Sequence, residues 1–325
     1  MNKNFSYFDI YIFAIFFIFA WTLYGGNIWN GDRDAYELYY ARDGISAWGV
    51  EILYGYINIW FYNAGISFQK FQIFISFTTL IITSVYLRKV SVFLGVSFLL
   101  YFILMFPLDY VLMRTSLSYA IVLNAFIALS QGRRFYYITL IIIATLIHQS
   151  ALLFLVFLLA NDGARLNNTY RYIIYSILLT IISLALSNYN FFAAKIVEHF
   201  SYYQTTWKTI FSSILYHSFS VYLIAKNFNR KGPVSKYDCF IRNLNIVSLV
   251  LFCLYFQADI FVRIFRLLVF VNIVYLVQGA FIQKKLTLYS LVYIPFYSVY
   301  LIYYYIFPTL EYSLYPLVKT NIFFN

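Results

Sequence analysis

The feature that most constrains this chain is a series of apolar segments, most of them close to the length that crosses a membrane. A helix needs about 20 predominantly apolar residues to span a bilayer, and no segment shows the alternating pattern of outer-membrane barrel strands. Of the 325 residues, 63% are hydrophobic and 11% are charged, so a water-soluble domain of this composition would expose large apolar patches. We therefore predict an all-α integral membrane protein, with residues 1–325 as a single transmembrane domain. The predicted helices cover residues 7–26, 71–88, 91–107, 113–130, 134–160, 171–187, 209–226, 240–257, 261–281 and 286–307.

The segment 134–160 is long for one crossing and carries His148-Gln149-Ser150 near its middle. Lys and Arg concentrate in cytoplasmic loops, so the two possible paths of this segment can be compared by counting. A single crossing leaves about 10 of the 23 Lys and Arg residues inside, whereas a turn at His148 leaves about 14 inside. We therefore predict a helix break near His148 and a polytopic bundle of about 10–11 transmembrane helices.

On this topology the unusual polar residues gather at the outer face. Residues 27–70 form a long first outer loop, and residues 188–208 form a second one. The second part of the first loop, residues 51–67, alternates apolar and aromatic residues with polar ones, so we expect it to lie in the membrane interface. Asp109 and Asp259 fall at the same face.

Three arginines are candidates for binding an anion. Arg114 begins the segment "MRTSLSYAIVLNAFIAL", and an arginine inside a membrane is expected to be paired or to face a polar cavity. Arg263 and Arg266 are three residues apart, so they share one helix face and could hold a diphosphate between them. The alternatives are an interfacial Arg114 and a structural pairing of Arg263 and Arg266 with Asp259.

The acidic and histidine candidates precede or interrupt apolar segments. Asp32 and Asp34 form a D-x-D pair of the kind that sugar transferases use, although two acids in a solvated loop are common. Glu51 precedes an aromatic segment, where partial desolvation would raise its pKa toward the range of a general base; a solvated interfacial acid is the alternative. His148 is either a satisfied core residue or a functional group at the predicted helix break.

Several classes of function find no support in the sequence. The net charge is +11, but the basic residues fall mostly in short loops, as topology determinants do, so we expect no nucleic acid partner. The two cysteines match no metal spacing, and the chain contains no P-loop and no G-x-S-x-G motif. We therefore predict no cofactor and no metal site.

The order of the motifs resembles the EpsG branch of the Wzy-type O-antigen and exopolysaccharide polymerases. The resemblance rests on an acidic and tyrosine-rich outer loop, a Glu before an aromatic-glycine stretch, an Arg that opens a helix, a basic turn and an "iHxSa" element. It covers residues 27–160, and weaker matches follow in "FVRIFRLL" and "EYSLYP". The matching stretches are "DRDAYELYY", "WGVEILYGYI…GISFQKF", "MRTSLSYAI", "QGRR" and "IHQSAL".

The resemblance implies a glycosyltransferase in the bacterial inner membrane, active at its periplasmic face. Such an enzyme transfers a growing glycan from undecaprenyl diphosphate to the non-reducing end of a lipid-linked repeat unit. Its partners would be the undecaprenyl-diphosphate-linked oligosaccharide, membrane lipid and a chain-length regulator. The expected residues are Arg114, Arg263 and Arg266 for the diphosphate, His148, then Glu51, then Asp34 for the base, and Asp32, Tyr36, Tyr39 and Tyr40 for sugars.

Three other functions remain open at the level of the sequence. A lipid-linked oligosaccharide flippase would also be basic and aromatic, but it should carry internal repeats and charges along a central path. A glycosyltransferase that uses a polyprenyl-phosphate sugar would take its catalytic acid from the D-x-D pair. A channel would need a polar stripe on several helices. Because the polar groups gather on one face, the sequence favours an enzyme.

Overall fold

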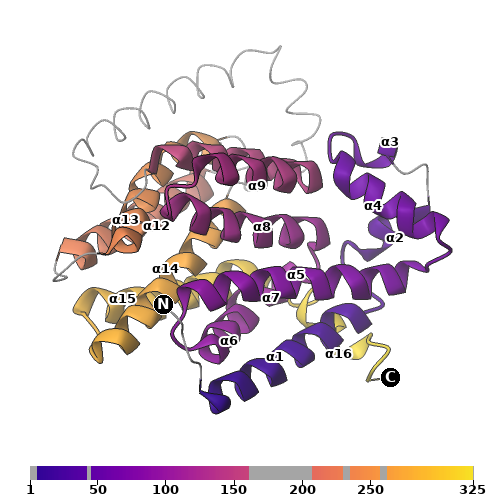
Figure 1. Ribbon diagram of the computed structural model, residues 1–325, viewed down its shortest axis with the longest axis horizontal. Helices are drawn as coiled ribbons and strands as arrows, with labels where there is room; N and C mark the ends of the chain where they lie inside the picture. Colours follow the sequence, from indigo (N-terminus) through magenta and orange to yellow (C-terminus); the bar gives the residue numbers. More distant parts are fainter. Residues whose placement is uncertain (1–5, 42–44, 161–206, 230–234, 257–261, 325) are drawn as a thin grey trace, which may run out of the picture.

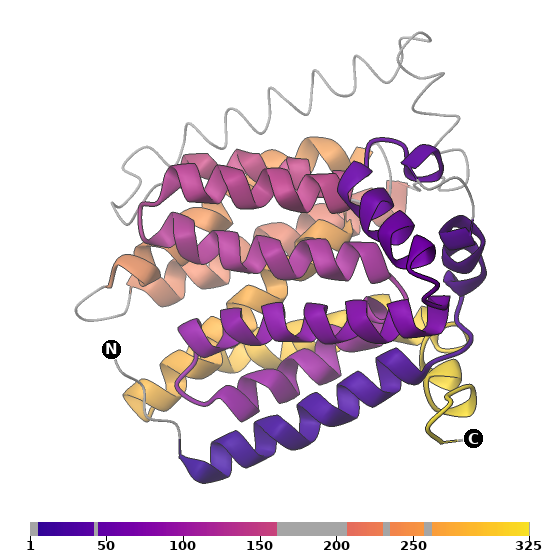
Figure 2. The same ribbon diagram turned by 45° about the vertical axis from the view of Figure 1, so that its right-hand side comes forward.

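The computed structural model shows a bundle of packed helices (Figures 1 and 2). Within the residues that it describes there is no β-strand, and six helices are long and apolar enough to cross a membrane. The all-α polytopic membrane fold predicted from the apolar segments is therefore confirmed. The described residues are 6–41, 45–160, 207–229, 235–256 and 262–324. The predicted helix at 171–187, residues 188–206 of the predicted second outer loop and Asp259 lie outside them, while the last two residues of that loop begin α12.

The six long helices run roughly along a common direction. Shorter apolar helices and the 23-residue α12 pack between them. The long helices are α1 (Tyr7–Gly26), α5 (Phe68–Val90), α8 (Met113–Ser130), α13 (Lys236–Ser248) continued by η2 (Leu249–Phe256), α14 (Val262–Gln283), and α15 (Leu288–Leu301) continued by η4 (Ile302–Ile306) and η5 (Phe307–Thr309). The other described helices outside residues 27–70 are α6 (Leu94–Leu104), α7 (Phe106–Asp109), α9 (Arg134–Ile147), η1 (Gln149–Ala160), α12 (Trp207–Asn229) and α16 (Leu314–Lys319).

Helix α8 forms the centre of the bundle. Every residue of α8 is buried except Arg114 and Asn124, and the helix packs against α5, α9, η1 and α13. Helix α8 carries buried polar side chains such as Ser116 and Ser118, which form hydrogen bonds with α1 and α9 that lipid could not provide. The N-terminal end of α8, where Arg114 lies, is therefore held by the packing of the whole bundle.

The chain turns back at His148. Helix α9 ends at Ile147, and His148 adopts an extended conformation before η1 begins. The hydroxyl of Tyr137 donates a hydrogen bond of 2.5 Å to the carbonyl oxygen of Phe154, whereas 17 residues of one straight helix would separate them by about 25 Å. The predicted break and reversal near His148 are confirmed.

Residues 27–70 are more ordered than the outer loop predicted for them. They form three short helices, α2 (Arg33–Ala41), α3 (Ile45–Trp48) and α4 (Ile52–Asn63), and α4 packs against α5 and α9. The alternation of apolar and polar residues does not distinguish an interfacial segment from a packed helix, because both have one apolar face. Tyr56 and Trp60, four residues apart on α4, are exposed, and the interfacial location remains a prediction.

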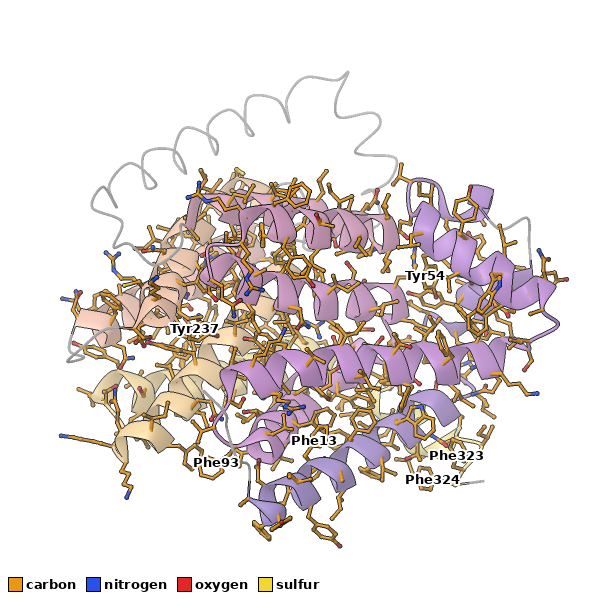
Figure 3. The ribbon with its side chains drawn as sticks, viewed as in Figure 1. Phe13, Tyr54, Phe93, Tyr237, Phe323 and Phe324 are labelled. Atoms are coloured by element: carbon orange, nitrogen blue, oxygen red, sulfur yellow. The ribbon has the colours of Figure 1, made fainter. Side chains whose placement is uncertain are left out.

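The C-terminal segment is joined to the end of α1. Asn27 and Asn321 form an isolated antiparallel bridge, backbone hydrogen bonds of 2.8 Å flank it between residues 26–28 and 320–322, and both asparagines are fully buried. Figure 3 shows Phe323 beside this end of α1. Residues from the two ends of the sequence therefore meet at one point of the bundle.

From this bridge, hydrogen bonds continue to α2. The carbonyl oxygen of Asn27 accepts hydrogen bonds from Arg33 Nη1 at 2.9 Å and from Gln72 Nε2 at 2.8 Å. Arg33 Nη1 also donates to Gln72 Oε1 at 2.6 Å. Because Arg33 is the first residue of α2, these bonds fix the position of the helix that carries Tyr36.

We predict that Gly26→Ala destabilises the protein. A Cβ at Gly26 would lie 2.3 Å from Asn321 Oδ1, and overpacking of this kind lowers the free energy of unfolding by about 1–3 kcal/mol. The helix propensity of alanine offsets at most about 1 kcal/mol. Thermal unfolding of the purified protein in detergent measures the change.

Gly31→Ala is the matched control, because the nearest atom to a Cβ at Gly31 is Tyr312 Cβ at 3.5 Å. Equal melting temperatures for the two variants would contradict a rigid contact between α1 and the C-terminal segment.

Candidate active site

Three of the predicted site residues come together at one end of the bundle. Arg114 is the second residue of α8, His148 follows the last residue of α9, and Glu51 precedes the first residue of α4. In Figure 1 the ends of α8 and α9 that carry these residues lie beside α3 and α4. The tertiary fold thus joins residues that are separated by up to 97 positions in the sequence.

The carboxylate of Glu51 contacts both other residues. Its Oε1 lies 2.7 Å from His148 Nδ1 and accepts a hydrogen bond of 3.2 Å from the backbone N–H of Gln149. Its Oε2 accepts a hydrogen bond from Arg114 Nη1. The Glu51 side chain is 4% exposed, whereas those of Arg114 and His148 are 28% and 17% exposed. The carboxylate is therefore buried behind an arginine and a histidine that both reach the surface.

The surroundings of Glu51 keep it ionised. Burial raises the pKa of Glu51, but the hydrogen bond with His148 and the positive charge of Arg114 outweigh burial and hold the pKa below its ordinary value. The expectation that desolvation would raise this pKa toward that of a general base is therefore wrong. An ionised carboxylate accepts the Nδ1–H of His148, which leaves Nε2 of the neutral imidazole as a hydrogen-bond acceptor.

An aromatic pair holds the guanidinium of Arg114. The Cζ atom of Arg114 lies 4.4 Å from the ring centroid of Trp48 and 5.4 Å from that of Tyr36, and the two rings stack with centroids 5.8 Å apart. Such cation–π contacts restrain a guanidinium without neutralising it. Trp48 is not among the site residues predicted from the sequence. Its position three residues before Glu51 was the signal that could have indicated it.

Several buried donors around Glu51 have no partner among the described residues. They are Arg114 Nε, Trp48 Nε1, the Tyr54 hydroxyl and the Ser150 hydroxyl. The Tyr54 ring lies 5.0 Å from that of Trp48, and Ser150 follows His148 by two residues. Buried polar groups are normally satisfied, so this group of donors fits a ligand rich in oxygen acceptors, such as a diphosphate or a sugar.

The other predicted sugar-binding residues lie on or beside α2. Tyr39 contacts the edge of Trp48 at 5.2 Å and is partly exposed, so it lies next to the site with Tyr36. Tyr40 is buried against α5, and its hydroxyl donates to the carbonyl oxygen of Ile66 at 2.7 Å. Asp32 is half-buried at the start of α2, and Asp34 is exposed on that helix. No hydrogen bond described here joins Asp34 to Glu51, Arg114 or His148.

Arg266 belongs to a separate ion pair. It is fully buried, and its Nη2 donates to Asp109 Oδ1 at 2.7 Å. Asp259 and the side chain of Arg263, which the sequence groups with Arg266, lie outside the described residues. In the part of the chain that the structure describes, no three His, Cys, Asp or Glu side chains lie close enough together to hold a metal ion.

We predict a pH-dependent contribution of Glu51 to stability. Because the pKa of Glu51 is lowered by folding, its contribution is complete above its ordinary pKa of 4.5 and is lost as the pH falls through the lower folded value. Glu51→Gln should therefore lower the free energy of unfolding by about 2 kcal/mol at pH 7, as expected for hydrogen bonds to a charged group. The difference from wild type should shrink below pH 4.5.

Thermal unfolding between pH 7 and pH 3 measures this, with Glu37→Gln as the control because Glu37 is exposed beside Arg33. A difference between wild type and Glu51→Gln that stays constant over this range would show that Glu51 is not ionised in the folded protein.

Comparison with known proteins identifies the family. The chain matches the model of the EpsG family over residues 10–317, which includes the second half where the sequence motifs are weak. The comparison with curated proteins and the comparison with solved structures each gave no match. Because the family match covers nearly the whole chain, the protein belongs to the EpsG family, a family of membrane proteins of the polysaccharide-polymerase type.

Proposed function

We propose that this protein is a polysaccharide polymerase that extends a glycan carried on undecaprenyl diphosphate. The observation that carries the proposal is the contact of one carboxylate, Glu51, with both Arg114 and His148. These three residues lie in three of the stretches that resemble the EpsG branch. A base, a cation and an orienting carboxylate are the groups that glycosyl transfer from a lipid diphosphate requires.

Each residue has a defined part in the proposed reaction. His148 Nε2 accepts the proton of the acceptor hydroxyl as its oxygen attacks the anomeric carbon of the donor sugar. The bond from that carbon to the diphosphate oxygen breaks, and the diphosphate leaves with the electron pair. Arg114 stabilises the charge that develops on the diphosphate, and Glu51 orients His148 through Nδ1. The products are the lengthened glycan and undecaprenyl diphosphate.

The distribution of basic residues supports a site at the periplasmic face. Helices α5, α9 and α14 each have one terminus at the end of the bundle opposite to Glu51, and many of the described Lys and Arg residues lie at that end. Cytoplasmic loops of membrane proteins carry an excess of Lys and Arg. The basic end of the bundle therefore fits the cytoplasmic side, and the end that contains Glu51 fits the periplasmic side. The basic residues at that end are Arg88, Lys89, Arg133, Arg134, Lys226, Lys236, Lys284 and Lys285.

The alternatives account for less of the site. A flippase has no need for a base held by a carboxylate, and its charges would follow a path through both leaflets. A transferase that takes its catalytic acid from the D-x-D pair would have Asp32 or Asp34 beside the Arg114 guanidinium, whereas Asp34 is exposed. The diphosphate role of Arg263 and the sugar-binding roles of Asp32, Tyr36, Tyr39 and Tyr40 remain part of the proposal.

Replacement of Arg114 or His148 should abolish polymer formation. We expect Arg114→Ala and His148→Asn each to lower polymerisation by about 100-fold or more, because a charge-stabilising donor and a general base each contribute at least that much. The measurement is the surface polysaccharide ladder of a deletion strain restored with each variant at matched membrane levels. Arg133→Ala, which removes an exposed arginine at the other end of α8 and α9, is the control.

The ladder distinguishes the candidate functions. A collapse to single repeat units supports the polymerase. Loss of single units from the surface would favour transport, and loss of activity in Asp34→Asn with normal polymer in His148→Asn would favour the transferase that uses the D-x-D pair.

A double-variant experiment separates the structural and diphosphate roles of Arg266. Removing one partner of a buried ion pair destabilises by about 3–5 kcal/mol, whereas replacing both with apolar residues is often neutral. We therefore expect Arg266→Leu or Asp109→Leu alone to lower the melting temperature and the double variant to regain stability. Absence of polymer in the stable double variant would support a diphosphate role, and normal polymer would assign Arg266 to folding alone.

A further inference from the structure

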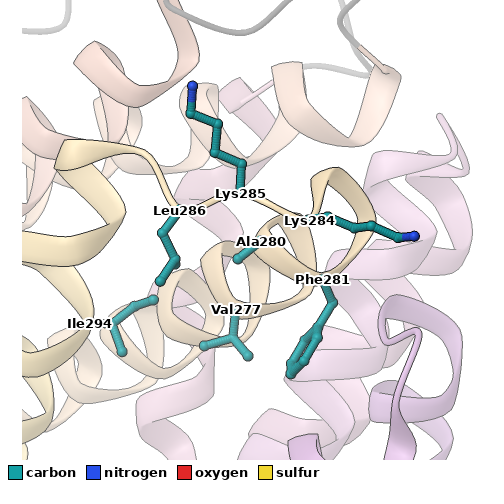
Figure 4. Close-up of a pocket in the computed structure, with 7 residues that line it drawn as sticks. All are labelled: Val277, Ala280, Phe281, Lys284, Lys285, Leu286 and Ile294. Atoms are coloured by element: carbon teal, nitrogen blue, oxygen red, sulfur yellow. The ribbon is translucent and has the colours of Figure 1, made fainter.

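A groove lies between α14 and α15, at the end of the bundle opposite to Glu51. It has a volume of about 490 Å³, and its apolar walls come from both helices and the turn between them (Figure 4). Two lysines of this turn, Lys284 and Lys285, lie at its rim, and both are exposed. The apolar lining consists of Val277, Ala280, Phe281, Leu286 and Ile294.

The groove opens on a surface that faces the membrane. Phe281 is 44% exposed, although its ring contacts that of Phe93 on the neighbouring α5–α6 turn with centroids 4.8 Å apart. Leu288 and Leu291, at the start of α15, are also exposed. Because α14 and α15 belong to helices that are long and apolar enough to cross a membrane, we expect these exposed side chains to face lipid chains. The lysines follow at the depth where an apolar helix ends and the headgroup layer begins.

The backbone at Lys284 is unusual for a lysine. Its φ is +51°, and among the described residues the others with positive φ are glycines. Helix α14 ends with Gln283, and the N–H of Lys285 donates to the carbonyl oxygen of Ala280 at 3.2 Å. Glycine is the usual residue at this left-handed position of a helix end, since it has no Cβ to strain. A lysine at this position therefore carries backbone strain, which is found most often where a residue has a function.

We propose that this groove binds an anionic phospholipid. One acyl chain lies against Val277, Phe281 and Ile294, and the ammonium groups of Lys284 and Lys285 bind the headgroup phosphate. An apolar channel whose cationic rim lies at headgroup depth matches both parts of such a lipid. A zwitterionic lipid offers the same chains but no net negative charge. The proposal concerns a different end of the bundle from the Glu51 site and does not depend on the proposed polymerase activity.

Native mass spectrometry of the full-length protein in detergent tests the proposal. The probes are phosphatidylglycerol and phosphatidylcholine with the same acyl chains. We expect the protein to retain phosphatidylglycerol preferentially, by about fivefold for each lysine that contacts the headgroup. The double variant Lys284→Gly with Lys285→Gln should retain both lipids equally. Because glycine relieves the strain at position 284, this variant should melt no lower than wild type, which excludes misfolding as the cause.

Two further variants identify the part of the lipid that is bound. Ala280→Leu adds bulk to the wall of the groove and should lower retention of both lipids, while Lys236→Gln, which removes an exposed lysine at the same end of the bundle, should change neither. Equal retention of the two lipids by wild type would overturn the proposal. So would unchanged phosphatidylglycerol retention in the double lysine variant, or displacement of the lipid by an equal concentration of inorganic phosphate.

Discussion

The contact of the Glu51 carboxylate with Arg114 and His148 is the interaction on which the candidate site depends. Each of these side chains would be expensive to bury alone in a membrane protein, and the carboxylate of Glu51 forms a hydrogen bond with each of the other two. The carboxylate also ties α4 to the start of α8 and the end of α9. A single ionised group therefore sets the position of three elements, the protonated nitrogen of His148 and the direction of the Arg114 guanidinium.

The remaining fold keeps this contact in place from three directions. Helix α8 is covered on all sides, so Arg114 cannot shift along the bundle axis. The reversal at His148 brings η1 back along α9, which leaves His148 at a tip where it reaches both Glu51 and the surface. The bridge between Asn27 and Asn321 continues through Arg33 to α2, and α2 places Tyr36 on Arg114. Local order at the site thus depends on residues from both ends of the chain.

The charge distribution gives the two ends of the bundle different chemistry. At one end, acids and aromatic rings surround a partly exposed arginine and histidine, which suits sugars and a diphosphate. At the other end, lysines and arginines follow the ends of apolar helices, which suits an anionic lipid surface. Because the two ends differ in charge, the proposed catalytic site and the proposed lipid groove fit the same orientation of the protein in the membrane.

The sequence by itself determined the membrane class, the helical fold, the family resemblance and the break at His148, because apolar length, loop charge and motif order are local properties of the chain. It also named Arg114, Glu51 and His148 separately. Only the tertiary structure decided that one carboxylate joins them, that Trp48 stacks on Arg114, that residues 27–70 contain three short helices and that Arg266 pairs with Asp109. It also decided that Glu51 is an orienting carboxylate with a lowered pKa, because a pKa depends on neighbours in space, and these neighbours are 63 and 97 residues away in sequence.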